Sequence, residues 1–202
     1  RYCPLTHEQA ALYQQQLDSS MEEIKSAGEG MERRGKILAL ITALKQICNH
    51  PAHYLMDGSA LPSRSGKLDF LTEMVDEAYE EGDRCLIFTQ FKEMGSLLKT
   101  HFENIYGRPV LFLHGGIPQK ERDKMVINFQ ESRADGPRLF VLSLKAGGTG
   151  LNLTAANRVY LFEPALDPAQ EVQAAGRIHR LGQTKEVTSR HSNLGPTDLQ
   201  IS

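Results

Sequence analysis

Tryptophan is absent from this 202-residue chain, cysteine occurs only three times, and neither sign of charge dominates. Three cysteines far apart in the sequence favour a reducing compartment over a disulfide framework. No apolar run reaches the roughly 18 residues of a transmembrane helix, so we expect no membrane partner. The formal net charge of -2 excludes an overall basic nucleic-acid binder. Any DNA contact must therefore come from a local patch or from backbone amides.

The start of the chain also lacks a secretory signal and a methionine, since it opens on Arg1. We therefore expect a fragment of a longer intracellular protein. A bacterial cytoplasm is favoured, and a nucleus is the alternative.

The first part of the chain predicts three helices. Thr6 and Gln9 form a capping box before the first helix. The second helix runs from about 34 to 49, and Pro51 stops it. We expect this helix to be well buried, because apolar residues crowd more than one of its faces. These residues are Ile37, Leu38, Leu40, Ile41, Leu44 and Ile47. The third helix is capped by Ser65 and ends at Gly82.

After Gly82 the pattern changes to strands that alternate with helices, which indicates βαβ units and a mostly parallel sheet. Short apolar runs predict strands at 85–88, 110–113, 139–142 and 159–162. Helices are expected at about 93–106, 118–131 and 168–182. We therefore divide the chain into a helical extension at 1–82, an α/β lobe at 83–188 and an irregular tail at 189–202.

Functional residues of such a sheet gather at the carboxyl ends of the strands. Polar and glycine residues follow three of the predicted strands. They are Thr89 and Gln90, then His114, Gly115 and Gly116, and then the loop from Ser143 to Leu153. The exposed amides of a glycine-rich loop can bind phosphate oxygens, although such a loop alone also fits a plain tight turn.

The helix after Pro168 carries a polar stripe. Gln170, Gln173, Arg177 and Arg180 recur at spacings of three and four, so they share one face. Two arginines one turn apart form a cationic fork suited to phosphate. A solvated salt-bridge face is the alternative reading.

Metal and thiol chemistry receive little support. Cys48, His50 and His53 are close in sequence, but no second ligand pair stands at zinc spacing, so we expect no metal. Cys85 opens an apolar strand, where a buried thiol is usually inert.

Taken together, these blocks resemble the C-terminal helicase lobe of Swi/Snf-type DNA-dependent ATPases, a superfamily-two helicase-like family. The resemblance covers about 34–187 and follows the family's order. It rests on the helix ending Cys48-Asn49-His50-Pro51, on 86–91, on His114-Gly115-Gly116 with Arg122 and Phe129, on Ser143 through Leu153, and on 173–183.

The resemblance implies an α/β, RecA-like three-layer sandwich of the P-loop NTPase type with a mostly parallel sheet and a helical extension. It also implies a chromatin-remodelling or translocating motor whose partners are double-stranded DNA, a first RecA-like lobe and other DNA-bound proteins. Its cofactor is ATP with Mg²⁺, bound mainly by the first lobe.

The resemblance also assigns residue roles. Arg177 and Arg180 are the catalytic arginine fingers. Five residues face the nucleotide or the other lobe: Gln173, Gly148, Thr149, Gly150 and Asn152. Seven face DNA: Thr89, Gln90, His114, Gly115, Gly116, Ser143 and Lys145.

The chain lacks a phosphate-binding GxxxxGK[ST] sequence. Gly66-Lys67 is the nearest candidate, but Leu61 and Leu68 replace the required glycine and hydroxyl residue. We therefore expect the isolated chain to hydrolyse no ATP. Two other classes stay open: a non-catalytic docking module for DNA or protein, and an RNA helicase lobe.

Overall fold

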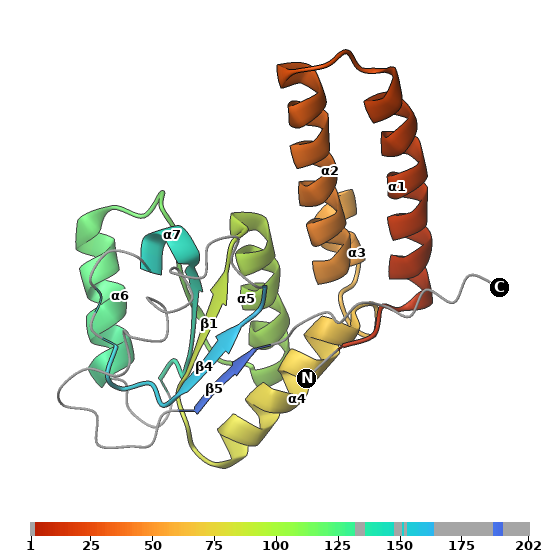
Figure 1. Ribbon diagram of the computed structural model, residues 1–202. Coiled ribbons are helices and arrows are strands. Elements are labelled where there is room, and N and C mark those ends of the chain that lie inside the picture. The colour runs from red at the N-terminus through yellow and green to blue at the C-terminus, as the bar shows by residue number, and fades with distance from the viewer. Residues whose placement is uncertain (1–2, 132–135, 148–150, 152, 164–187, 192–202) are drawn as a thin grey trace. The chain divides into compact units, whose positions relative to one another are not determined.

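The computed structural model describes residues 3–131, 136–147, 151, 153–163 and 188–191 (Figure 1). The chain divides into two compact units, whose main segments are Tyr2–Phe70 and Leu71–Asn193. We call them the helical unit and the sheet unit. No helix in the described part of the chain is long and apolar enough to span a bilayer.

The helical unit is built on a hairpin of two long helices, α1 (His7–Ser26) and α2 (Met31–Asn49). The predicted capping box of α1 is confirmed. The Thr6 hydroxyl oxygen accepts from the Gln9 amide at 3.2 Å, and the Thr6 amide donates to the Gln9 side chain at 3.1 Å. Gln9 then donates to the carbonyls of Ile47 at 2.9 Å and Cys48 at 3.1 Å. One side chain therefore joins the start of α1 to the end of α2.

Helix α2 corrects one prediction and confirms another. Among its described residues only Leu40, Ile47 and Asn49 are buried, because α1 packs against one side of it. Leu38 is 64% exposed, so the expectation that this helix is well buried was wrong. The predicted stop is confirmed, because α2 ends at Asn49 and Pro51 begins a separate short helix, α3 (Pro51–Leu55), which His50 caps.

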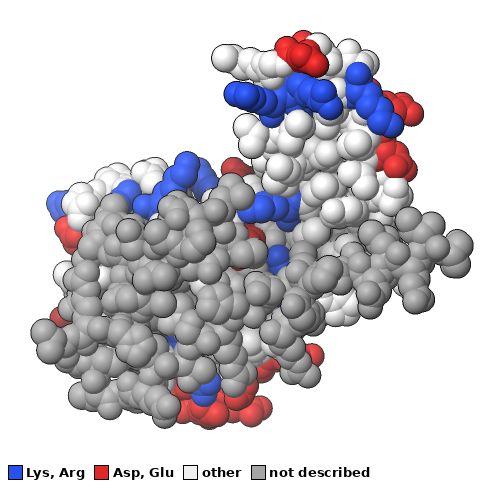
Figure 2. All heavy atoms as spheres, in the orientation of Figure 1, with Lys and Arg blue, Asp and Glu red and all other residues white. Residues whose placement is uncertain are grey.

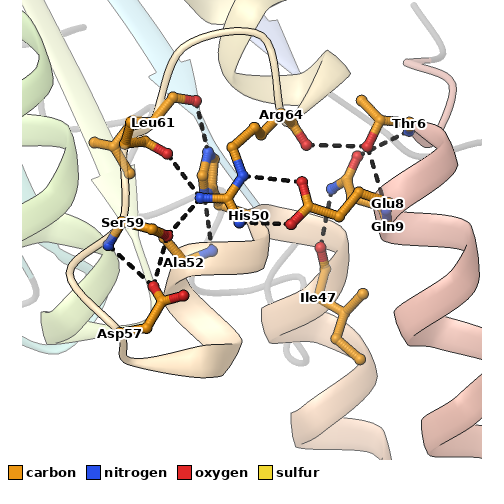
Figure 3. A network of polar contacts seen from close by, with 11 residues as sticks. Thr6, Glu8, Gln9, Ile47, His50, Ala52, Asp57, Ser59, Leu61 and Arg64 are labelled. Atoms are coloured by element: carbon orange, nitrogen blue, oxygen red, sulfur yellow. Dashed lines mark hydrogen bonds and ion pairs between the residues drawn. The ribbon is translucent and has the colours of Figure 1, made fainter.

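A polar network holds the loop between α3 and α4 (Figure 3). Arg64 forms a fork on the Glu8 carboxylate, with Nε–Oε2 at 2.9 Å and Nη2–Oε1 at 2.5 Å, and donates to the Ala60 carbonyl at 2.8 Å. His50 Nδ1 accepts from the Ala52 amide at 2.9 Å. Its Nε2 must then carry the proton and donate to the Leu61 carbonyl, 2.8 Å away. Both ring nitrogens of His50 are therefore engaged with the backbone rather than offered to a metal.

This geometry predicts that acid weakens the helical unit. Burial, aided by the Arg64 charge, lowers the pKa of His50, against the opposing effects of the Leu61 hydrogen bond and of Glu8 and Asp69. The unfolded chain binds a proton near the ordinary histidine pKa of about 6.5, whereas the folded chain resists it. Stability is thus present above that pKa and is lost as the pH falls toward the folded value. Urea unfolding at about pH 7.5 and 5.5 measures this loss. In His50→Asn, which keeps a capping side chain, the loss should be smaller. An identical pH dependence in both proteins would contradict the assignment to His50.

In the part of the chain that the structure describes, the sheet unit has five parallel strands in the order β2-β3-β1-β4-β5. They are β1 (Cys85–Thr89), β2 (Leu111–Leu113), β3 (Leu139–Ser143), β4 (Arg158–Leu161) and β5 (Thr188–His191). Helices α5 (Lys92–Tyr106) and α6 (Gln119–Glu131) lie on opposite sides of the sheet (Figure 1). The predicted parallel α/β architecture is confirmed.

Alternate side chains of each strand pack on opposite faces of the sheet. Leu86, Phe88, Phe140 and Leu142 pack with Phe129 of α6 in one buried cluster. On the other face, Tyr160 donates to the Met74 carbonyl of α4 (Gly66–Glu80) at 2.9 Å. A methyl group added at Gly95 of α5 would lie 2.4 Å from the Phe112 ring, so a glycine is required for that contact. Burial raises the pKa of the Cys85 thiol to about 12, which makes it a poor nucleophile.

The observed boundaries differ from the predicted ones in two places. The sheet unit starts at Leu71, within α4, rather than at residue 83. Residues 189–191, assigned to an irregular tail, belong to β5, which pairs in parallel with β4. No apolar run marks this strand, because it lies at the edge of the sheet.

Candidate functional site

The described candidate residues lie along one edge of the sheet. His114, Ser143 and Thr89 end or follow β2, β3 and β1, and Glu163 follows β4. Thr89 and Ser143 are direct partners in the parallel register. The strand order therefore arranges the four positions as His114, Ser143, Thr89 and Glu163 along the carboxyl edge.

Glu163 fixes the loop after β1, and sequence reasoning gave it no functional role. Its carboxylate accepts from the Thr89 hydroxyl at 2.7 Å and from the Gln90 amide at 2.9 Å. Glu163 is 2% exposed and Thr89 fully buried, whereas Gln90 is only partly buried. The Thr89 hydroxyl thus faces inward and positions the loop. Of Thr89 and Gln90, Gln90 is therefore the residue that can reach a ligand.

The side chain of Ser143 hydrogen-bonds to the backbone. It is buried, and its hydroxyl oxygen accepts from the Ala146 amide at 3.3 Å, so it caps the short helix α7 (Leu144–Gly147). Leu144 and Ala146 are buried, and Lys145 between them is exposed. The sequence therefore presents a lysine at the carboxyl edge, on a turn whose neighbours are anchored in the core.

The described residues that follow the glycine-rich loop are anchored as well. Leu151 and Leu153 are buried in the core cluster. Gln130 of α6 donates to the Thr154 hydroxyl at 3.0 Å and accepts from the Ala155 amide at 2.8 Å. The described residues on both sides of positions 148–150 are thus held in place.

The loop after β2 is held by an arginine. Arg122 donates to the carbonyls of Ile117 at 2.8 Å and Gly115 at 3.3 Å. The His114 ring accepts from the Gly116 amide at 3.1 Å. Gly115 and Gly116 are exposed, so the turn presents backbone groups to solvent.

The electrostatic environment of this loop is positive. Partial burial, followed by the charges of Lys92 and Arg122, lowers the pKa of His114. The ring is therefore neutral at pH 7, and the two permanent cations supply the positive charge. Lys92, at the first position of α5, was missed because nothing in its spacing distinguishes it from an ordinary surface lysine.

Seven predicted site residues lie outside the described residues: Gly148, Thr149, Gly150, Asn152, Gln173, Arg177 and Arg180.

Comparison with known proteins identifies the family. Residues 66–182 match the family described as Helicase conserved C-terminal domain. The C-terminal domain of a Sulfolobus solfataricus SWI2/SNF2 ATPase is 42% identical, with a TM-score of 0.75 over 84% of this chain and 72% of that one. The chain belongs to the SWI2/SNF2 ATPases, as their C-terminal helicase lobe.

Two further relatives extend the match. The Sulfolobus SWI2/SNF2 ATPase core in complex with double-stranded DNA has a TM-score of 0.83 and 38% identity, over 96% of this chain and 40% of that one. The protein YwqA of Bacillus subtilis is 44% identical over 188 residues, which is 92% of this chain and 20% of that protein. This chain therefore spans a fifth or less of the length of the curated relatives it matches. The RecA-like fold inferred from the resemblance is confirmed by these structures.

Proposed function

We propose that this lobe is one half of an ATP-dependent motor on double-stranded DNA. The arrangement that carries the proposal is the carboxyl edge of the sheet. There Gln90, the His114–Gly116 turn and Lys145 follow the neighbouring strands β1, β2 and β3, and the charges of Lys92 and Arg122 act on His114. Exposed amides and cations are the groups that proteins use on a phosphate backbone. The Sulfolobus ATPase core, whose structure contains double-stranded DNA, supports the same class of ligand.

The nucleotide side of the proposal rests on family membership. A first RecA-like lobe would hold ATP and Mg²⁺. This chain would supply Arg177 and Arg180 to the transferring phosphate, with Gln173, Gly148, Thr149, Gly150 and Asn152 at the boundary between lobes. Because the chain has no GxxxxGK[ST] sequence, hydrolysis requires the first lobe. Remodelling of chromatin or of other DNA-bound proteins belongs to the same proposal.

A reconstitution experiment tests the proposal. Phosphate release is measured for this chain alone, for the first lobe alone and for the joined two-lobe protein, each with duplex DNA or RNA. We expect hydrolysis only in the joined protein, with stronger stimulation by duplex DNA. Stimulation by RNA alone would assign the lobe to RNA helicases, and inactivity of the joined protein would indicate a docking module.

Direct DNA binding by this chain gives a second measurement. Lys145→Ala should weaken duplex binding regardless of sequence and reduce the slope of log affinity against log salt by about one. Lys99→Ala is the charge-matched control, because Lys99 pairs with Glu103 within α5 at 2.6 Å. Equal effects of the two substitutions would remove Lys145 from the DNA surface.

A further inference from the structure

The outer face of α2 exposes more apolar surface than the motor function explains. Met31 is 90% exposed, Leu38 64%, Ile41 41% and Ile37 38%. Scattered exposed apolar residues are ordinary, whereas several on one helix of a soluble unit mark an interaction surface. All four lie in the helical unit, outside the carboxyl edge of the sheet.

Two cations flank Leu38 and Ile41 of this apolar surface. Arg34, Leu38, Ile41 and Lys45 recur at spacings of four, three and four, so they form one stripe along the helix. Among the described residues, neither Arg34 nor Lys45 is paired with a carboxylate, whereas Lys36 pairs with Glu32 at 3.2 Å. Figure 2 shows Lys and Arg side chains around the upper part of the α1–α2 hairpin, beside uncharged surface.

Gly35 is a second, independent feature of the same surface. A glycine inside a helix is less stable than alanine, and Gly35 has a helical neighbour on each side. A methyl group added there would meet nothing within 4 Å, so no contact in the described structure requires a glycine. A backbone that approaches α2 closely from outside would require one.

We propose that the outer face of α2 docks an acidic amphipathic helix of a partner protein. The partner's apolar stripe would cover Leu38 and Ile41, and its backbone would lie against Gly35. Two of its carboxylates would meet Arg34 and Lys45, which are eleven residues and therefore about 16 Å apart along the helix. The partner's carboxylates should stand at the same separation, about three turns of its own helix.

The same features argue against other occupants. A DNA backbone satisfies the two cations but gains nothing from covering Leu38 and Ile41. A second copy in an antiparallel two-fold pairing would place Arg34 and Lys45 cation against cation. An acidic helix satisfies both the charges and the apolar surface.

Fluorescence anisotropy with the complete 202-residue chain tests the proposal. The probe is a labelled helical peptide with a leucine stripe and two glutamates eleven positions apart. Its matched control carries lysines at those two positions. We expect the chain to bind the glutamate peptide at least about tenfold more tightly, a difference of one decade in Kd. The double variant Arg34→Glu/Lys45→Glu should reverse the preference.

Single substitutions separate docking from folding. Leu38→Ala should weaken binding about tenfold, whereas Leu55→Ala, which truncates an exposed leucine outside α2, should leave it unchanged. Gly35→Ala should raise the Tm of the chain and still weaken binding, so that unfolding cannot explain the loss.

Several results would overturn the proposal. They are equal affinity for the two peptides, no binding of either peptide, no effect of Leu38→Ala on binding, and no reversal of the peptide preference by the double variant. Self-association abolished by Leu38→Ala would assign the surface to a dimer. Loss of duplex DNA binding in the double variant would assign it to DNA. None of these measurements involves ATP hydrolysis, so the proposal stands or fails independently of the motor function.

Discussion

Replacing Arg180 by alanine in the joined two-lobe protein is expected to lower DNA-stimulated ATP hydrolysis by about 10³- to 10⁵-fold. A guanidinium at the γ-phosphate neutralises charge that develops as the phosphoryl group transfers, and no water molecule replaces it equally well. Arg177→Ala should give a loss of similar kind, because the two side chains share one helical face in the sequence pattern. The measurement is steady-state phosphate release at saturating duplex DNA.

The form of this loss matters as much as its size. An interaction made mainly in the transition state lowers kcat and leaves KM for ATP nearly unchanged. Arg180→Lys keeps the charge but loses the planar fork, so it should recover only a small part of the rate. Lys99→Ala serves as the surface control. Retention of most of the kcat in Arg180→Ala would end the assignment of a catalytic arginine at this position.

Glu163→Ala is expected to destabilise the sheet unit by about 3 kcal/mol, because it removes two hydrogen bonds to a charged acceptor and leaves the buried Thr89 hydroxyl only the Phe91 carbonyl, 3.4 Å away, to donate to. Glu163→Gln should be milder for Thr89, since its oxygen can still accept the hydroxyl proton. Its amide group would face the Gln90 N–H, donor against donor. The measurement is the free energy of urea unfolding.

A mutant cycle identifies the carboxylate as the cause. Thr89→Val keeps the shape and removes the hydroxyl, so the effects of Thr89→Val and Glu163→Ala should be less than additive. Additive losses would mean that the two side chains stabilise the sheet separately. Glu163→Gln should also weaken duplex DNA binding through displacement of Gln90, whereas Thr72→Val, a hydroxyl removal on α4, should not.

The sequence predicted the first four strands well because each contains a continuous apolar run between turn residues. Cys85 to Phe88 and Leu139 to Leu142 are buried on both faces. The capping box of α1 was equally readable, since Thr6 and Gln9 interact within one turn. Local physics decides such features, so one sequence suffices.

Features that depend on distant partners were missed. The exposed side of α2 could not be predicted, because apolar residues surround the helix and only the placement of α1 decides which of them are covered. The role of Glu163 could not be predicted, since its partners Thr89 and Gln90 lie far away in sequence. Strand β5 has no apolar run to mark it.

The strand order has a consequence for synthesis on the ribosome. The central strand β1 pairs with β3 and β4, which follow it only at Leu139 and Arg158. A nascent chain that has exposed β1 but not β4 carries an apolar strand with unpaired edges, which is the kind of segment that aggregates or recruits chaperones. The sheet can therefore be completed only late in translation, and slowing the ribosome between β1 and β4 should lower the yield of native protein.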